Sequence, residues 1–145
     1  MMKKRYTALI IDGQGGGIGR LLTQNIKEVF PELLVRAVGT NVMATQAMIK
    51  AGADEAATGE NAVIVGCKKA DLIIGPIGIV IADALMGEMT PAMARAVGQS
   101  SASRILIPIN QCDNIIVGVE NFSLSFLIRN CIEQIRICIN KLSED

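Results

Sequence analysis

A cluster of glycines near the start of the chain carries the clearest chemical signal. Five glycines lie within the seven positions from Gly13 to Gly19, directly after an apolar, β-branched run that ends at Asp12. Such a run is typical of a buried strand, and helical spacing returns at Leu21. A strand, a glycine turn and a helix together direct backbone N–H groups and the positive end of a helix dipole at an anion. We therefore expect this turn to bind a phosphate; the alternative is a tight turn that binds nothing.

The spacing of these glycines departs from the dinucleotide fingerprint, which has glycines at its first, third and sixth positions. Counting from Gly13 places Ile18 in the sixth position. The pattern Gly13-x-x-x-Gly17-x-Gly19 instead resembles the glycine motif of the short-chain dehydrogenases. That family also uses a Tyr-x-x-x-Lys pair, whereas the single tyrosine here, Tyr6, precedes the first strand and is followed by no lysine at that spacing. The resemblance therefore stops at the loop.

Asp12 stands where the short-chain dehydrogenases usually have threonine. A carboxylate beside the loop repels an anion, so Asp12 opposes a direct phosphate contact. Two other roles are open to it. It could hold Mg²⁺, or it could accept hydrogen bonds from the amides of the turn itself.

A second glycine turn, at residues 75–78, follows the predicted strand 71–74. In a doubly wound sheet of order 3-2-1-4-5 the first and fourth strands are neighbours, and a ligand binds in the crevice between the loops that follow them. Polar residues that follow other strands would supply orienting hydrogen bonds. The expected ligand-binding residues are Asp12, Gly13, Gln14, Gly15, Gly16, Gly17, Ile18, Gly19, Thr40, Asn41, Gly75, Pro76, Ile77, Gly78, Asn110 and Gln111.

Strands and helices alternate along the whole chain, which predicts a mostly parallel sheet. The expected fold is α/β, a three-layer, Rossmann-like, doubly wound sheet of five or six strands in one domain over residues 1–145. Asn41 or Thr40, Thr58, Thr90 and Ser123 are expected to cap helices. The predicted strands are 7–12, 33–38, 53–57, 71–74, 104–109 and 115–119. The predicted helices are 21–30, 42–51, 62–69 and 79–86, one that restarts at Pro91, and a closing helix with apolar positions from Leu124 to Leu142.

Composition excludes several classes of function. The chain of 145 residues has 14 basic and 14 acidic residues and no histidine. The absence of histidine excludes Ser-His-Asp and Cys-His catalysis, and the balanced charge gives no basic face for nucleic acid. The four cysteines form no C-x-x-C pair, so we expect free buried thiols and no metal site. Without an apolar span or a signal-peptide core, we expect a cytoplasmic protein that does not enter membranes.

These features predict a nucleotide- or dinucleotide-binding module. The ligand would be NAD(P), another adenine nucleotide such as coenzyme A, or a smaller phosphate. No acidic residue follows the second predicted strand, which disfavours NAD, and no arginine follows it, which disfavours NADP.

Two alternatives stay open. One is a small enzyme whose site is completed across an oligomer interface. The other is an oligomeric interaction protein without a ligand. The wide apolar stripe of the closing helix favours a homo-oligomer. The catalytic residues are unknown. The candidates for acid–base or nucleophilic chemistry are Asp12, Asp83, Glu88, Cys112, and Lys68 or Lys69, with Cys112 the best single candidate.

Five runs taken together resemble a family of small bacterial proteins described only as a domain of unknown function. The resemblance extends over nearly the whole chain and implies a bacterial, cytoplasmic, stand-alone domain with no activity to carry over. The runs are Ile11-Asp12-Gly13-Gln14-Gly15-Gly16-Gly17-Ile18-Gly19, Gly39-Thr40-Asn41, Ala57-Thr58-Gly59-Glu60-Asn61-Ala62, Gly75-Pro76-Ile77-Gly78-Ile79 and Pro108-Ile109-Asn110-Gln111-Cys112.

Overall fold

Five strands form the sheet at the centre of the protein. A computed structural model describes residues 4–109 and 113–145. The strands are β1 (Thr7–Asp12), β2 (Leu34–Gly39), β3 (Glu55–Thr58), β4 (Leu72–Pro76) and β5 (Ser103–Ile107). They pair in parallel in the order β3-β2-β1-β4-β5. The predicted order and the predicted α/β class are therefore confirmed.

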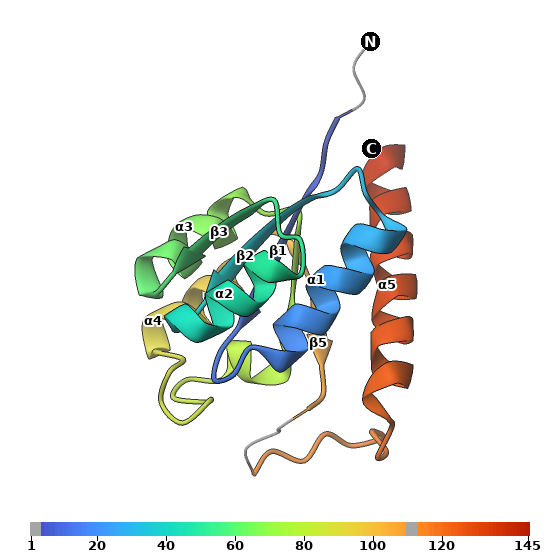
Figure 1. Cartoon of the computed structure of the whole chain (residues 1–145). Helices are drawn as coiled ribbons and strands as arrows, with labels where there is room; N and C mark the ends of the chain where they lie inside the picture. Colours follow the sequence, from blue (N-terminus) through green and yellow to red (C-terminus); the bar gives the residue numbers. More distant parts are fainter. Residues whose placement is uncertain (1–3, 110–112) are drawn as a thin grey trace.

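Helices cover both faces of this sheet (Figure 1). They are α1 (Gly17–Val29), α2 (Val42–Lys50), α3 (Glu60–Lys69), the 3₁₀ helix η1 (Ile77–Val80), α4 (Pro91–Gln99) and α5 (Leu124–Glu144).

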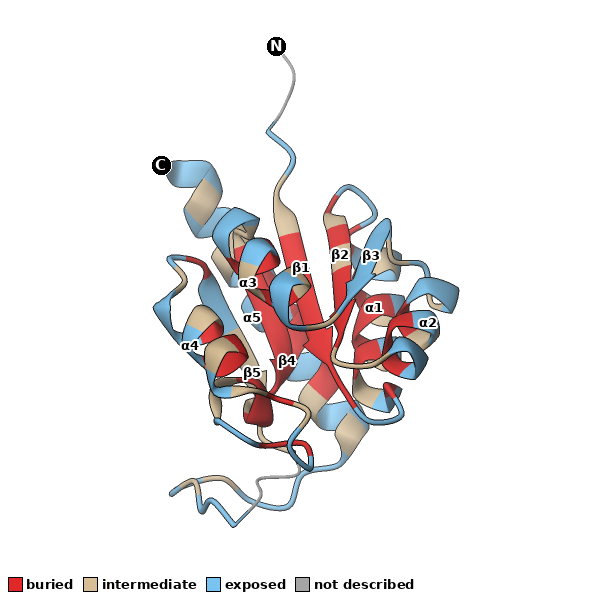
Figure 2. Cartoon of the chain, turned by 90° about the vertical axis from the view of Figure 1, so that its left-hand side faces the viewer, coloured by how far each residue is buried: buried red, intermediate tan, exposed pale blue. Residues whose placement is uncertain are grey.

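The side chains of the central strand β1 are buried on both faces of the sheet, which gives the protein its three layers. Ala8 and Ile10 pack into a core with α1, α2 and α5, whereas Leu9 and Ile11 pack into a second core with α3 and α4. Successive side chains of a strand point to opposite faces, so a strand covered on both sides is a continuous apolar run. Figure 2 shows this as a buried β1 and β4 between helices whose outer surfaces are exposed.

The starts of the helices agree with most of the predicted caps. The side chain of Asn41 accepts a hydrogen bond from the Ala44 amide at the start of α2. Thr90 caps α4 in the same way, and Ser123 caps α5. The predicted cap at Thr58 is wrong, because α3 begins after Gly59, whose φ of 104° favours glycine.

Two predicted elements do not form. The expected helix over 79–86 ends after Val80, because Asp83, Leu85 and Met86 all have positive φ, which is incompatible with an α-helix. The expected strand over 115–119 is absent, and Ile115 and Val117 are 91% and 96% exposed. The apolar run Ile115-Ile116-Val117-Gly118-Val119 predicted a short edge strand, but this segment does not pair with the sheet.

The closing helix α5 uses its apolar stripe mainly to cover the sheet. Ile128, Cys131, Ile132 and Ile135 are buried in the core that α5 shares with α1. The homo-oligomer stays a prediction. Within residues 4–109 and 113–145, no helix combines the length and the apolar character that a membrane span needs.

Candidate functional site

Asp12, the last residue of β1, accepts hydrogen bonds from the glycine loop and from the first turn of the helix that follows it. Its carboxylate accepts hydrogen bonds from the Gly13 amide at 2.8 Å and from the Gly19 amide, in the first turn of α1, at 2.6 Å. Asp12 is 4% exposed, and this burial raises the pKa of its carboxyl, while the amides of Gly19, Gly13 and Ile18 act to lower it. Of the two roles left open above, Asp12 therefore accepts hydrogen bonds from the turn's own amides.

Three of the five loop glycines are needed for packing. A Cβ at Gly13 would clash with the Thr40 hydroxyl and meet Leu85 and Glu88. A Cβ at Gly16 would lie 2.7 Å from the Cα of Ala44, and Gly16 also has a φ of 73°. A Cβ at Gly19 would lie 2.6 Å from the sulfur of Met48 and 2.8 Å from the Cβ of Asp12. These glycines allow β1, α1 and α2 to approach closely.

Gly15 and Gly17 differ from the other glycines of the loop. A Cβ at either position would meet nothing within 4 Å. Their amides donate to no residue that the structure describes, whereas the Gly16 amide donates to the Gly13 carbonyl at 2.9 Å. Both glycines line a pocket of about 180 Å³ at the N-terminus of α1. Its lining residues are Asp12, Gly13, Gln14, Gly15, Gly16, Gly17, Ile18, Pro76 and Leu85.

The segment between η1 and α4 brings a second carboxylate to the loop. The Oε1 atom of Glu88 accepts hydrogen bonds from the Gln14 amide at 2.9 Å, the Thr40 hydroxyl at 2.6 Å and the Asn41 side-chain amide at 2.7 Å. The Thr40 bond is the main cause of the lowered pKa of Glu88, and the bonds from Gln14 and Asn41 lower it further. Glu88 thereby joins the glycine loop to the end of β2.

This segment has an unusual backbone. Asp83, Leu85 and Met86 have φ values of 64°, 57° and 56°, in the left-handed region that costs an L-residue about 1–2 kcal/mol. The Asp83 amide donates to the Met89 carbonyl at 2.7 Å, and Leu85 is buried against the loop. These contacts and the bonds of Glu88 hold the segment over the glycine loop.

The lowered pKa of Glu88 predicts a pH-dependent contribution to stability. Because the folded pKa lies below its ordinary value of 4.5, the contribution is present above that pH and is lost as the pH falls through the folded pKa. We expect Glu88→Gln to lower the melting temperature by roughly 2–4 °C at pH 7. This difference in melting temperature should disappear in acid.

Thermal unfolding between pH 7 and pH 3 measures the difference. Asp83→Asn is the control, because it removes one exposed charge from the same segment. A difference that stays constant down to pH 3 would contradict the prediction.

The second glycine turn contributes less to the pocket than expected. Of residues 75–78, Pro76 alone lines the pocket. Gly75 lies within β4, where a Cβ would clash with the Ile11 carbonyl oxygen. A Cβ at Gly78 would lie 3.3 Å from Ala84 Cβ and 3.4 Å from Leu85 Cδ2. Ile77 begins η1 and is half-buried.

The remaining predicted residues fall into three groups. Thr40 and Asn41 adjoin the glycine loop through Glu88, and Asn41 also donates to the Gln14 carbonyl at 2.9 Å. Asp83 is exposed, away from the lining of the pocket. Three predicted residues lie outside the described part of the chain: Asn110, Gln111 and Cys112.

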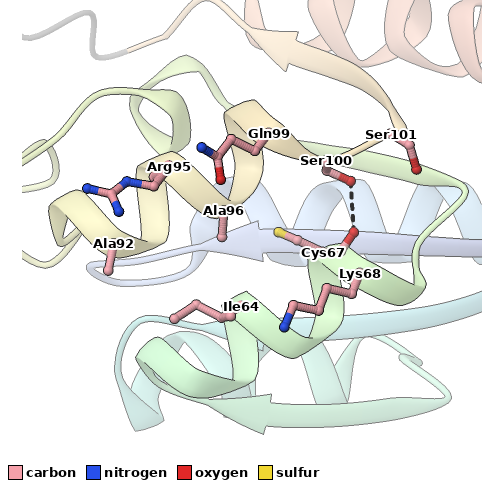
Figure 3. Close-up of a pocket in the computed structure, with 9 residues that line it drawn as sticks. All are labelled: Ile64, Cys67, Lys68, Ala92, Arg95, Ala96, Gln99, Ser100 and Ser101. Carbon is pink, nitrogen blue, oxygen red and sulfur yellow. Dashed lines mark hydrogen bonds between the residues drawn. The ribbon is translucent and has the colours of Figure 1, made fainter.

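A larger cleft of about 540 Å³ lies between α3 and α4 (Figure 3). Its lining includes Lys68, Arg95 and Cys67, and it shares no residue with the glycine-loop pocket. Burial raises the pKa of the Cys67 thiol to about 11, so this thiol is protonated near neutral pH and is a poor nucleophile. The Ser100 hydroxyl donates to the Cys67 carbonyl at 2.8 Å. The cleft therefore offers volume but no group prepared for chemistry, and the glycine loop is the candidate site.

The other candidate reactive side chains lie apart from the glycine-loop pocket. Lys68 lines the cleft beside α3, so Lys68 is not placed with Asp12 and Glu88. Burial raises the pKa of the Cys131 thiol to about 12, in the core under α5. Within the described ranges, no three cysteine, aspartate or glutamate residues group closely enough to hold a metal ion.

The fold and the site together define a class of protein. A parallel sheet in the order β3-β2-β1-β4-β5, covered on both faces and with a glycine loop after its central strand, is a three-layer α/β architecture. The chain belongs to the family described as Domain of unknown function (DUF3842), which it matches over residues 7–140. It matches none of the curated proteins and none of the solved structures with which it was compared.

The sequence predicts Glu88 as a candidate acid–base group and not as a ligand-binding residue. Glu88 is separated from Gln14 by 74 positions, and no local pattern links the two. One signal was available in the sequence, because the end of the second strand lacked the acidic residue that a dinucleotide-binding sheet usually has there. That missing residue could have prompted a search for a carboxylate from another segment.

Proposed function

We propose that this protein is a nucleotide-binding module whose ligand places a phosphate on the glycine loop. The observation that carries the proposal is the pair of amides at Gly15 and Gly17, which have no partner in the described chain and line a pocket at the start of α1. Free N–H groups and a helix N-terminus favour an anion. The pocket also adjoins β4 through Pro76, at the reversal of strand order where ligands of such sheets bind.

The charges around the loop limit the ligand. No lysine or arginine is among the described residues that line the pocket, and Asp12 and Glu88 bring two carboxylates to the loop. Each added negative charge on the ligand is therefore repelled. This favours a ligand with one or two phosphates over a triphosphate, and AMP, ADP and NAD are the first compounds to test.

The proposal predicts that one small substitution blocks binding without weakening the fold. In Gly17→Ala the new methyl group enters open space at the pocket, so we expect phosphate affinity to fall at least roughly tenfold. Alanine also favours a helix over glycine, so the stability should not decrease. Titration of the ¹⁵N-labelled protein with inorganic phosphate, AMP and NAD, followed at the amides of Gly15 and Gly17, measures this effect.

Gly98→Ala is the matched control. Gly98 also lies in a helix, and a Cβ added there would have nothing within 4 Å, but Gly98 is absent from the lining of the pocket. This variant should bind as the wild type does. Gly16 is unsuitable for the test, because any side chain there meets the backbone of Ala44. If none of the three compounds shifts the loop amides, or if both variants bind equally well, the proposal is wrong and an interaction protein without a ligand becomes the better hypothesis.

A further inference from the structure

Hydrogen bonds to one oxygen of the Glu88 carboxylate hold it in place, and its other oxygen accepts none from the described residues. Its Oε1 atom accepts three hydrogen bonds, from Gln14, Thr40 and Asn41, at 2.6–2.9 Å. Its Oε2 atom accepts none from the residues that the structure describes. An ionised carboxylate has about four acceptor sites, so Oε2 keeps its capacity for two donors. The result is a preorganised acceptor beside the glycine loop.

The position of Glu88 relative to the pocket suggests which donors it would meet. A Cβ at Gly13 would lie 3.0 Å from Glu88 Oε1 and 3.0 Å from Leu85 Cδ1, and Gly13 and Leu85 both line the pocket. Glu88 itself is not among the residues that line the pocket, but it lies against Gly13 and brings its carboxylate to that side of the loop. It stands at the end of β2, next to β1 in the sheet, where dinucleotide-binding sheets have a carboxylate for the ribose hydroxyls.

We propose that Glu88 makes the site selective for ribonucleotides by accepting hydrogen bonds from the vicinal hydroxyls of the ribose. This inference rests on the proposed function. Hydrogen bonds from hydroxyls to a carboxylate are charge-assisted, so losing one is costly. A 2′-phosphate at the same position would place like charges together, so the site should reject NADP while it accepts NAD. Glu88 thus replaces the acidic residue that is absent after β2.

The experiment compares ligands that differ only at the 2′ position. AMP and 2′-deoxy-AMP carry the same charge, and NAD and NADP differ by one phosphate. Binding of all four is measured by calorimetry with the wild type and with Glu88→Gln. We expect the wild type to bind AMP roughly tenfold more tightly than 2′-deoxy-AMP. In Glu88→Gln this ratio should fall to within about threefold, and NADP should bind nearly as well as NAD.

Glu60→Gln is the matched control. Glu60 accepts a hydrogen bond from the Thr90 hydroxyl at 2.8 Å, so this variant also weakens a carboxylate contact to the segment before α4. It should keep the wild-type ratio, which separates ribose selection from a general loosening of the segment. Circular dichroism checks that both variants fold.

Three results would overturn the inference. Equal binding of AMP and 2′-deoxy-AMP by the wild type would do so, and the proposed function would survive if Gly17→Ala still lowered the affinity. Tighter binding of both nucleotides by Glu88→Gln would show that Glu88 instead competes with the ligand and closes the crevice. Failure of all four compounds to bind, together with no response to phosphate, would overturn the inference and the proposed function together.

Discussion

Replacing Asp12 with alanine is expected to lower the free energy of unfolding by about 3 kcal/mol. The substitution leaves the amides of Gly13 and Gly19 without their acceptor at a site that is 4% exposed. Each buried donor left unsatisfied costs about 1–3 kcal/mol. Part of this cost is offset, because burial raises the pKa of Asp12 and so disfavours its charge. Urea denaturation followed by circular dichroism measures the change.

Asp71→Ala is the matched control for this prediction. Asp71 also accepts a hydrogen bond from a β1 amide, that of Thr7 at 2.9 Å, but at the opposite end of the strand and in a less buried position. Losing this single bond should cost about 1 kcal/mol. If Asp12→Ala were no more destabilising than Asp71→Ala, the carboxylate of Asp12 would not be the element that holds the glycine loop to α1.

Gly75→Ala is the second substitution with a large expected effect, a loss of about 3 kcal/mol of stability. The new Cβ would clash with the carbonyl oxygen of Ile11 on the neighbouring strand and approach Ile79 Cδ1 to 3.0 Å. Neither atom can move freely, because β1 and β4 are paired and Ile79 is completely buried. Overpacking at such a position forces the backbone apart. Thermal and urea unfolding measure the loss.

Gly98→Ala again provides the comparison, because it adds the same methyl group in open space and should leave the stability unchanged or slightly higher. Gly17→Ala should behave like this control in stability while it loses phosphate binding. Gly75→Ala, in contrast to Gly17→Ala, should lower the stability of the fold. A fully stable Gly75→Ala protein would mean that β1 and β4 do not approach as closely as the structure has them.

The architecture of this protein was predictable from the sequence because it depends on local patterns. Apolar, β-branched runs such as Thr7–Asp12 alternate with segments of helical spacing, which favours a parallel sheet covered on both faces. The caps at Asn41 and Thr90 followed from local residue types, whereas the strand order followed from the doubly wound topology that this alternation favours. The place of the glycine loop, after the central strand and before α1, was also a local property.

Only the tertiary structure distinguished the glycines that pack from those that are open. A Cβ added at Gly13, Gly16 or Gly19 would clash with Thr40, Ala44 or Met48, so the need for glycine there depends on α2 and on the end of β2. The spacing of the loop glycines cannot separate them from Gly15 and Gly17, because a spacing pattern does not specify which neighbours approach.

The prediction of a helix over 79–86 was wrong because local spacing does not specify which distant residues approach a segment. Its apolar spacing is helical, but long-range hydrogen bonds from Gln14, Thr40 and Asn41 to Glu88 accompany a chain path with left-handed residues. Local propensity is a weak preference, which tertiary contacts override. The sequence by itself therefore determined the sheet, its order and the position of the glycine loop, whereas the tertiary structure decided that the carboxylate of Glu88 meets this loop at the end of β2.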